Sequence, residues 1–348
     1  MHNNPVLVDA GLLRQLGNYT RKCLPSEKCA IISDSNVAPL FADCITKSLN
    51  SAGFRWTLIT IRAGEKSKTL EQVAVICDRM IAAGLDRQSF VVGLGGGMIG
   101  DISGFVAAIY HRGIPHVQIP TTLLAMVDSS IGGKTGVDTR AGKNLIGAFH
   151  QPSLVIDDLD LLRTLPRPQF NQGFAEIIKH AVIADAKMFR MLQSWKAGAA
   201  PALQRVIKRN IQIKSRIVMK DERDRTGQRA VLNFGHTVGH AIERVGNYRK
   251  FLHGEAVSLG MVAACAISMK RAGLPPDQRA AIVDLLERFG LPTRLPPKFP
   301  RKKILDAVNF DKKFESGEVR FVVTPCVGVA YIADNVTLED IREATENL

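Results

Sequence analysis

Short apolar runs alternate with helix-like segments through the first half of the chain, and this alternation restricts the possible folds most strongly. The runs at 29–34, 54–61 and 89–97 are each followed by a segment with helical periodicity. Two later runs, at 116–120 and 152–157, are also strand-like. Apolar strands that alternate with helices are typical of a buried parallel sheet. The sequence therefore predicts an α/β N-terminal domain of the dinucleotide-binding, Rossmann-like type.

The pattern changes near Pro166–Pro168, where the strand-like runs give way to long segments with helical periodicity. We place a domain boundary at this point. Residues 1–165 are predicted to form the α/β domain, and residues 166–348 a mostly α-helical domain. Because ligands often bind in clefts between domains, we expect the functional site to lie between the two.

The composition excludes several classes of protein. Hydrophobic residues make up 46% of the chain and charged residues 23%, which is ordinary for a globular protein. No apolar run approaches the roughly 18–20 residues of a membrane span, and the N-terminus lacks the pattern of a secretory signal. The six cysteines are scattered without a CxxC motif, which indicates free thiols. We expect a soluble cytoplasmic protein with no membrane partner.

The net charge of +13 and the pI of about 9.6 favour an anionic partner. Basic residues cluster in part, at 204–220 and 297–303. However, the sequence shows no interleaving of aromatic and basic residues of the kind that binds RNA. We therefore expect a small anionic substrate and no nucleic-acid partner.

A glycine-rich motif follows the third strand-like run. The stretch VVGLGGGMIGD satisfies GxGxxG through Gly95, Gly97 and Gly100, and it opens a helix. Glycines allow the backbone to approach a pyrophosphate at the positive end of a helix. The acidic residue expected about 20 positions later is missing. The glycine motif is therefore either a plain tight turn or a loop that binds a dinucleotide in a non-standard way. Asp34, after the first strand-like run, is either a contact to a ribose hydroxyl or a turn-forming residue.

A long segment in the middle of the chain combines glycines with charged and polar side chains. Residues 120–152 contain Asp128, Lys134, Lys143 and Asn144. Backbone N–H groups and ammonium groups that converge in such a loop suit phosphate binding. A solvated loop is the alternative.

Two histidines four positions apart raise the question of a metal site. His236 and His240 would lie on one side of a helix, which is the spacing of a two-histidine metal site. Thr237 occupies the position that holds Glu in the hydrolytic HExxH motif. Spacing alone favours both histidines as ligands.

Further candidate ligands lie outside this motif. Glu176 precedes Lys179 and His180 by three and four positions, which allows either a metal pair with His180 or a surface ion pair with Lys179. His253 stands at an expected helix start. A catalytic zinc needs three protein ligands and one open position. The residue pattern does not choose among Glu176, His236, His240 and His253.

Several long motifs resemble those of the 3-dehydroquinate synthase family, a group within the sugar phosphate cyclases. They occur in the family's order and cover about residues 30 to 325. The motifs lie at 93–105, 112–152, 173–185, 232–243 and 252–257.

The resemblance implies a cytoplasmic lyase of the shikimate pathway of aromatic amino acid biosynthesis. Such an enzyme converts 3-deoxy-D-arabino-heptulosonate 7-phosphate to 3-dehydroquinate and phosphate, with NAD and a divalent metal, zinc or cobalt. It implies five steps, namely oxidation, phosphate elimination, reduction, ring opening and an intramolecular aldol closure. It also implies a homodimer.

The resemblance assigns roles to individual residues. The implied metal ligands are Glu176, His236 and His253. His240 is implied to contact the substrate phosphate instead, so the argument from spacing would be half wrong. The implied NAD contacts are Asp34, Glu65, Lys68, Gly96, Gly97, Asp101, Thr121, Thr122, Lys143 and Thr164.

The remaining implied contacts concern the substrate, a phosphorylated sugar acid. Asp128 and Lys179 are implied to contact its hydroxyl groups. The implied phosphate contacts are Lys134, Asn144 and His240, with Arg112 reaching in from a partner subunit. The implied contacts to the carboxylate end are Lys214, Arg229 and Asn233, with Lys312 as a further cation beside Lys313.

The chain departs from the family pattern in one segment. The stretch KDERDRTGQRAVLNFGH is one residue longer than the common pattern before Arg229. The family's acidic residue there matches Asp224, or is replaced by Arg225 or Thr226 under another alignment. Another sugar phosphate cyclase, a metal-dependent polyol dehydrogenase and a nucleic-acid-binding protein are the alternative functions.

Overall fold

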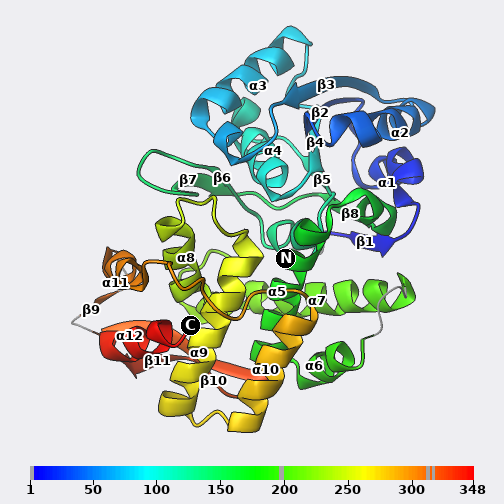
Figure 1. Cartoon of the computed structure of the whole chain (residues 1–348). Helices are drawn as coiled ribbons and strands as arrows, with labels where there is room; N and C mark the ends of the chain where they lie inside the picture. The colour runs from blue at the N-terminus through cyan, green and yellow to red at the C-terminus, as the bar shows by residue number, and fades with distance from the viewer. Residues whose placement is uncertain (1–3, 196–199, 311–313, 316–317) are drawn as a thin grey trace. The chain divides into compact units, whose positions relative to one another are not determined.

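The computed structural model describes residues 4–195, 200–310, 314–315 and 318–348. The chain divides into two compact units, Met1–Leu165 (unit 1) and Pro166–Leu348 (unit 2). Figure 1 shows the helices and strands of each unit with their labels.

Unit 1 is built on a parallel sheet of six strands, which confirms the predicted α/β class. The strand order is β1-β8-β5-β4-β2-β3. The chain runs from β2 outward to β3 and then returns to place β4 on the other side of β2. This reversal is a topological switch point, where ligands of such sheets usually bind. The strands are β1 (Val6–Asp9), β2 (Lys28–Asp34), β3 (Arg55–Ile61), β4 (Phe90–Gly95), β5 (His116–Pro120) and β8 (Leu154–Asp158).

Helices cover both faces of this sheet because its strands are apolar on both sides. Ile31 and Val92 pack against α1 and α2 on one face, whereas Ile32 and Val91 pack against α3 and α4 on the other (Figure 1). The helices are α1 (Leu16–Cys23), α2 (Ala38–Ser51), α3 (Leu70–Ala82) and α4 (Gly97–Ile109). Short 3-10 turns are η1 (Leu12–Gln15), η2 (Glu65–Ser67), η3 (Tyr110–Arg112) and η5 (Leu159–Thr164).

The glycine-rich segment at 120–152 contains more regular structure than a loop. Ala125–Ser129 forms a π-helical turn, η4. β6 (Lys134–Val137) and β7 (Ile146–Phe149) then pair as an antiparallel ribbon. The backbone of Gly136 lies close to that of Gly147 across this ribbon, so its glycines bring two strands together.

Unit 2 is mostly helical and also contains a small antiparallel sheet that the sequence analysis did not predict. α9 lies at its centre and packs against α5, α8, α10, α12 and β10. Most of α9 is buried, which suits its composition of small and apolar residues. The elements are α5 (Arg167–Ala184), α6 (Ala186–Gln193), α7 (Ala200–Lys220), η6 (Gln228–Asn233), α8 (His236–Val245), α9 (His253–Ala272), α10 (Pro276–Arg288), α11 (Arg301–Phe310), β9 (Phe314–Glu315), β10 (Glu318–Cys326), β11 (Val329–Val336) and α12 (Leu338–Glu346).

All six cysteines are free thiols. Within the part of the chain that the structure describes, no helix is both long enough and apolar enough to cross a membrane.

One buried carboxylate in unit 1 lacks a partner. Asp157 on β8 is fully buried, and neither of its oxygens has a hydrogen-bond partner among the described residues. Burial raises the pKa of Asp157 well above its usual value. The folded chain therefore binds this proton more tightly than the unfolded chain does, so stability falls as the pH rises above about 4.

We predict that Asp157→Asn stabilises the protein at neutral pH by about 1–3 kcal/mol, because the wild-type carboxyl must either take up a proton on folding or carry an unpaired buried charge. The gain should shrink as the pH falls below about 4, because the carboxyl then becomes protonated in the unfolded chain as well. Urea unfolding at several pH values measures the effect. Asp158 provides a matched control, since its carboxylate accepts N–H bonds from Gly11, Leu13 and Asp160 at 2.9, 2.7 and 3.0 Å. Asp158→Asn should destabilise, and a destabilised Asp157→Asn would contradict the argument.

Candidate active site

Three helices of unit 2 bring one carboxylate and two imidazoles together. Glu176 lies on α5, His236 is the first residue of α8 and His253 is the first residue of α9. The Nε2 atoms of His236 and His253 lie 3.5 and 3.7 Å from the same oxygen, Glu176 Oε1. One ligand atom from each of the three residues lies within 4.8 Å of the other two.

Two glycines allow α8 and α9 to approach closely enough for this arrangement. Gly235 precedes His236 with a φ of 77°, a left-handed conformation that favours glycine. A Cβ atom on Gly260 of α9 would lie only 1.9 Å from the carbonyl oxygen of Gly235. The backbone at the start of α8 thus rests directly on α9, and this contact helps to set the spacing between His236 and His253.

The spacing of the three side chains fits a metal ion. A tetrahedral ion with ligand distances of about 2.0–2.2 Å holds neighbouring ligand atoms about 3.3–3.6 Å apart. The observed distances of 3.5 and 3.7 Å are close to this range and longer than most hydrogen bonds. Two imidazoles and one carboxylate are also a common donor set for a catalytic zinc, with a fourth position for substrate or water. The residues present therefore fit a zinc or cobalt ion.

The protonation states of two of these groups also suit metal binding. Burial would raise the pKa of Glu176, but the Lys179 ammonium and then His236 hold it well below its usual value. Burial lowers the pKa of His236 well below its usual value, and Lys179 lowers it further. At neutral pH, Glu176 is therefore an anion and His236 a neutral imidazole, which are the forms that coordinate metals.

His253 has a different electrostatic environment. Burial lowers the pKa of His253, but the nearby carboxylates of Glu176 and Glu243 outweigh it and raise the pKa to about 10. A metal ion between these groups must displace a proton from His253.

Both alternatives for Glu176 can be compared with the structure. The Glu176 carboxylate forms an ion pair with Lys179, which was one of the two expectations. Both side chains are buried, however, whereas that expectation placed the pair on the surface. Nδ1 of His180 lies 2.8 Å from Asn210 Oδ1. A ligand atom of His180 also lies within 4.8 Å of one of Glu176, so a metal pair of these two residues stays open.

His240 lies beside the cluster, on the exposed side of α8. Its ring centroid is 5.2 Å from that of His236 and 6.2 Å from that of His253. His240 belongs to a second group of residues that could hold a metal, together with Glu243 and His253. The geometry alone therefore leaves His240 close enough to act beside the first group.

In unit 1, the glycine-rich loop lies at the switch point of the sheet. β4 ends at Gly95, Gly96 precedes α4, and Gly97 is its first residue. β2 and β5 flank β4, so Asp34, which ends β2, and Thr121, which follows β5, lie at the same edge of the sheet. The loop thus occupies the usual ligand-binding position of such sheets although it belongs to the third strand-helix unit.

A buried lysine organises the polar residues near this loop. Lys68 donates hydrogen bonds to Asp101 on α4 and to Asn144, and its Nζ lies 3.8 Å from Glu65 Oε1. Burial raises the pKa of Asp101 to about 6, although the Lys68 ammonium opposes the rise. Asn144 has a φ of 55°, and its backbone N–H donates to Asp138. The cluster joins the 120–152 segment to the helix of the glycine-rich loop.

The other predicted unit 1 residues occupy varied environments. Asp34 Oδ1 accepts N–H bonds from Asn36 and Val37, which is the turn-forming role that the sequence left open. Thr122 Oγ1 accepts the N–H of Ala125. Thr164 is exposed at the end of η5, and its hydroxyl donates to Leu161 O.

Arg112 lies in a strained turn after α4. His111, Arg112 and Gly113 have φ values of 48°, 68° and 120°, so three successive residues are left-handed. Such a conformation costs of order 1–3 kcal/mol for each non-glycine residue. The turn is anchored by Tyr110, whose hydroxyl donates to Leu85 O at 2.9 Å, and it exposes Arg112.

The predicted carboxylate contacts lie on adjacent elements of unit 2. Lys214 of α7 and Arg229 of η6 are both buried, and α7 packs against η6. The Arg229 Nη1 donates to Glu222 O at 3.2 Å. Asn233 ends η6, whereas Lys312 lies outside the described residues.

Asp221 holds the loop that leads to Arg229, and the sequence analysis did not single it out. Its carboxylate accepts backbone N–H bonds from Arg225, Thr226 and Arg229. Burial alone would raise the pKa of Asp221, but these bonds lower it to about 2. Asp221 therefore closes the lengthened loop that leads to Arg229. A carboxylate followed by a short polar loop was the available signal.

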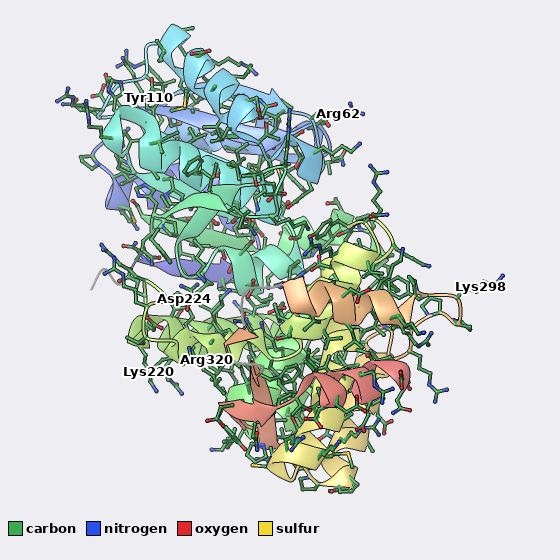
Figure 2. All side chains as sticks on the ribbon, turned by 90° about the vertical axis from the view of Figure 1, so that its left-hand side faces the viewer. Arg62, Tyr110, Lys220, Asp224, Lys298 and Arg320 are labelled. Atoms are coloured by element: carbon green, nitrogen blue, oxygen red, sulfur yellow. The ribbon has the colours of Figure 1, made fainter. Side chains whose placement is uncertain are left out.

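Asp224 has a different position from Asp221. It has a φ of 53° and is exposed, and Figure 2 shows it near Lys220, which ends α7. The structure thus assigns the loop-closing role to Asp221, and the role of Asp224 stays open.

Comparison with known proteins agrees with these features. Family models described as 3-dehydroquinate synthase N-terminal and C-terminal match residues 58–172 and 173–314. The 3-dehydroquinate synthase of Symbiobacterium thermophilum is 45% identical over 99% of this chain and 97% of its own. That of Pelobacter propionicus is 43% identical over 97% of this chain and 94% of its own. The chain belongs to the 3-dehydroquinate synthase family.

Solved structures extend the comparison beyond the 3-dehydroquinate synthase family. The 2-epi-5-epi-valiolone synthase of Streptomyces hygroscopicus subsp. jinggangensis, solved with NAD+ and Zn2+, is 28% identical with a TM-score of 0.89. That match covers 100% of this chain and 97% of the other. A 2-deoxy-scyllo-inosose synthase complexed with carbaglucose-6-phosphate, NAD+ and Co2+ is 25% identical, with the same TM-score, over 98% and 96% of the two chains.

A more distant structure shares the fold alone. A probable glycerol dehydrogenase from Sinorhizobium meliloti is 16% identical over 99% of this chain and 96% of its own, with a TM-score of 0.68. Fold similarity at this level does not determine the reaction.

Proposed function

We propose that the chain is an enzyme, a 3-dehydroquinate synthase that converts 3-deoxy-D-arabino-heptulosonate 7-phosphate to 3-dehydroquinate and phosphate. The main support is the cluster of Glu176, His236 and His253. It occurs in a chain that is 45% identical to a 3-dehydroquinate synthase. This reaction belongs to the shikimate pathway of aromatic amino acid biosynthesis.

The proposal assigns one cofactor to each part of the chain. Residues 1–165 bind NAD at the glycine-rich loop, and residues 166–348 bind zinc or cobalt through Glu176, His236 and His253. When bound, NAD accepts and returns a hydride, and the divalent metal polarises the substrate oxygen at the oxidised carbon. The NAD contacts are Asp34, Glu65, Lys68, Gly96, Gly97, Asp101, Thr121, Thr122, Lys143 and Thr164. The buried Lys68–Asp101 pair holds two of these side chains in place.

The chain's own polar residues bind and orient the substrate. Lys179, buried beside Glu176, donates to a substrate hydroxyl, and Asp128 accepts from another. Lys134, Asn144 and His240 bind the phosphate. Lys214, Arg229 and Asn233 bind the carboxylate, and Lys312 adds a cation. Cations at both ends suit a doubly anionic substrate.

We also propose a homodimer in which Arg112 contacts the phosphate bound by its partner subunit. The strained turn at His111 and Arg112 supports this role, since strain of this kind is often retained for function. Leu145, Ile146 and Phe149 are exposed on or beside β7 and offer an apolar surface for association. A monomeric mass by light scattering at micromolar concentration would rule out the dimer.

A cytoplasmic location completes the proposal. Six free thiols in one chain are typical of a reducing compartment, which supports it. Recovery of the native protein from a periplasmic or membrane fraction would contradict it.

We predict that the purified protein releases phosphate from the heptulosonate phosphate with no net formation of NADH. The hydride that NAD accepts in the oxidation is returned in the reduction, so NAD is regenerated in every turnover. Phosphate release and absorbance at the NADH band are followed together over many turnovers, with zinc present.

The control is the same mixture after chelation of the metal, which should release almost no phosphate. One NADH per product would contradict the synthase proposal and favour a polyol dehydrogenase. Similarity to the inosose synthase structure favours another cyclase as the second candidate. Faster turnover of a hexose 6-phosphate that lacks a carboxylate would support that candidate.

A further inference from the structure

Glu243 is a buried acidic residue to which neither the sequence motifs nor the proposed reaction assigns a role. It lies on α8, two turns after His236, and its side chain is only 7% exposed. Its Oε2 lies 3.4 Å from Nδ1 of His253. A carboxylate buried against a candidate metal ligand suggests a function, because burying a charged group is costly.

The imidazole of His253 lies between two carboxylates. Its Nε2 faces Glu176 Oε1 at 3.7 Å, and its Nδ1 faces Glu243 Oε2 at 3.4 Å. A neutral imidazole has one N–H and one lone pair on its two ring nitrogens. If Nε2 supplies the lone pair to a metal, the proton must be on Nδ1, where Glu243 accepts it.

His236 has an equivalent arrangement with a different acceptor. Its Nδ1 lies 3.2 Å from the carbonyl oxygen of Phe234, while its Nε2 faces Glu176. Both histidines therefore have an acceptor at Nδ1 and direct Nε2 toward the same carboxylate. The acceptor of His236 belongs to the backbone, whereas that of His253 is a side chain that mutation can remove.

We propose that Glu243 is a positioning residue for the metal site. It accepts the Nδ1–H of His253, holds the ring in the tautomer that leaves Nε2 available, and orients that atom toward Glu176 and His236. This inference rests on the proposed function, because His253 is a metal ligand only within that proposal.

A direct metal ligand is the competing role for Glu243. His240, Glu243 and His253 form a second group whose ligand atoms lie within 4.8 Å of one another. The two groups share His253. Glu176 is fully buried with Lys179 and close to both Nε2 atoms, which favours the first group. The competing role predicts that His240 also matters for metal affinity.

The test measures metal affinity rather than activity. Zinc and cobalt dissociation constants are determined by chelator competition for wild type, Glu243→Gln and Glu243→Ala. Removing an acceptor behind a metal-bound histidine typically weakens affinity about 10–100-fold. Glu243→Ala should show a loss of this size, whereas Glu243→Gln keeps a carbonyl acceptor and should show a smaller one.

The visible spectrum of bound cobalt provides a readout that a purely structural role would not change. Both Glu243 variants should shift the cobalt bands, because the orientation of one ligand changes while the ligand set stays the same. Unfolding with excess chelator shows whether each variant remains folded. Glu339→Gln is a matched loss of charge on the exposed face of α12, where Glu339 pairs with Arg342, and this variant should bind both metals like wild type.

The outcomes separate this inference from the proposed function. If His236→Ala loses the metal but both Glu243 variants bind it with wild-type affinity and spectrum, the positioning role is overturned and the ligand set stands. If Glu243→Ala and His240→Ala both lose the metal as completely as His236→Ala, Glu243 is a ligand and the positioning role is again overturned. If His236→Ala binds metal as tightly as wild type, the proposed ligand set fails, and this inference fails with it.

Discussion

Purified His236→Ala is expected to contain almost no zinc or cobalt after exhaustive dialysis. His236 offers an unprotonated Nε2 close to Glu176, and its removal leaves two ligands where a catalytic site needs three. Turnover should fall by roughly 1000-fold or more, because the metal supplies several kcal/mol of charge stabilisation. Metal content is measured by atomic emission on dialysed protein.

The same change at His240 should have a different effect. His240 lies on the exposed side of α8, and we propose that it contacts phosphate. His240→Ala should therefore retain its metal. A lost hydrogen bond to a charged group is worth about 1.5–3 kcal/mol, so kcat/KM should fall roughly 10–150-fold. Equal metal loss in the two variants would restore the interpretation that both histidines are ligands.

Arg229→Ala is expected to weaken substrate binding about 30-fold or more. The guanidinium is buried, and its loss leaves the substrate carboxylate without its charged partner, at a cost of about 2–5 kcal/mol. Arg229→Lys should fall between wild type and Arg229→Ala, because it keeps the charge but loses the paired N–H geometry. Substrate affinity is measured by calorimetry in the presence of NAD.

NAD affinity provides the internal control for both Arg229 variants. All the proposed NAD contacts lie in residues 1–165, so the dissociation constant for NAD should stay close to the wild-type value. A folded Arg229→Ala that binds substrate like wild type would show that Arg229 does not bind the carboxylate.

Local patterns in the sequence were sufficient to predict much of unit 1. β2, β3 and β4 are apolar runs, each followed after a short turn or loop by a helix, so their type follows from periodicity. β1 was missed because it is short and its partner, β8, lies about 150 residues away in the sequence. The β6–β7 ribbon was missed because glycines in a short sequence segment indicate a loop. In the structure, Gly136 and Gly147 instead allow the two paired backbones to approach closely.

The candidate site shows the same limit. The spacing of His236 and His240 is local and predicted a shared metal, whereas Glu176 and His253 come from other helices and are distant in sequence. No spacing rule connects three separate helices, so the set Glu176, His236 and His253 was assigned from family resemblance. Their proximity in the structure supports that assignment, although the individual roles stay predictions.

The contact between Gly260 and Gly235 has a consequence for protein engineering. Because α8 and α9 meet there through main-chain atoms, the separation of His236 and His253 depends little on the surrounding apolar side chains. Libraries of variants can therefore change those apolar side chains, or the lysines and arginines proposed to bind the substrate. Such variants would have new substrate specificities around an unchanged metal site. Residues 235 and 260 are the positions that such libraries should leave unchanged, although glycine has no side chain to bind a metal or a substrate.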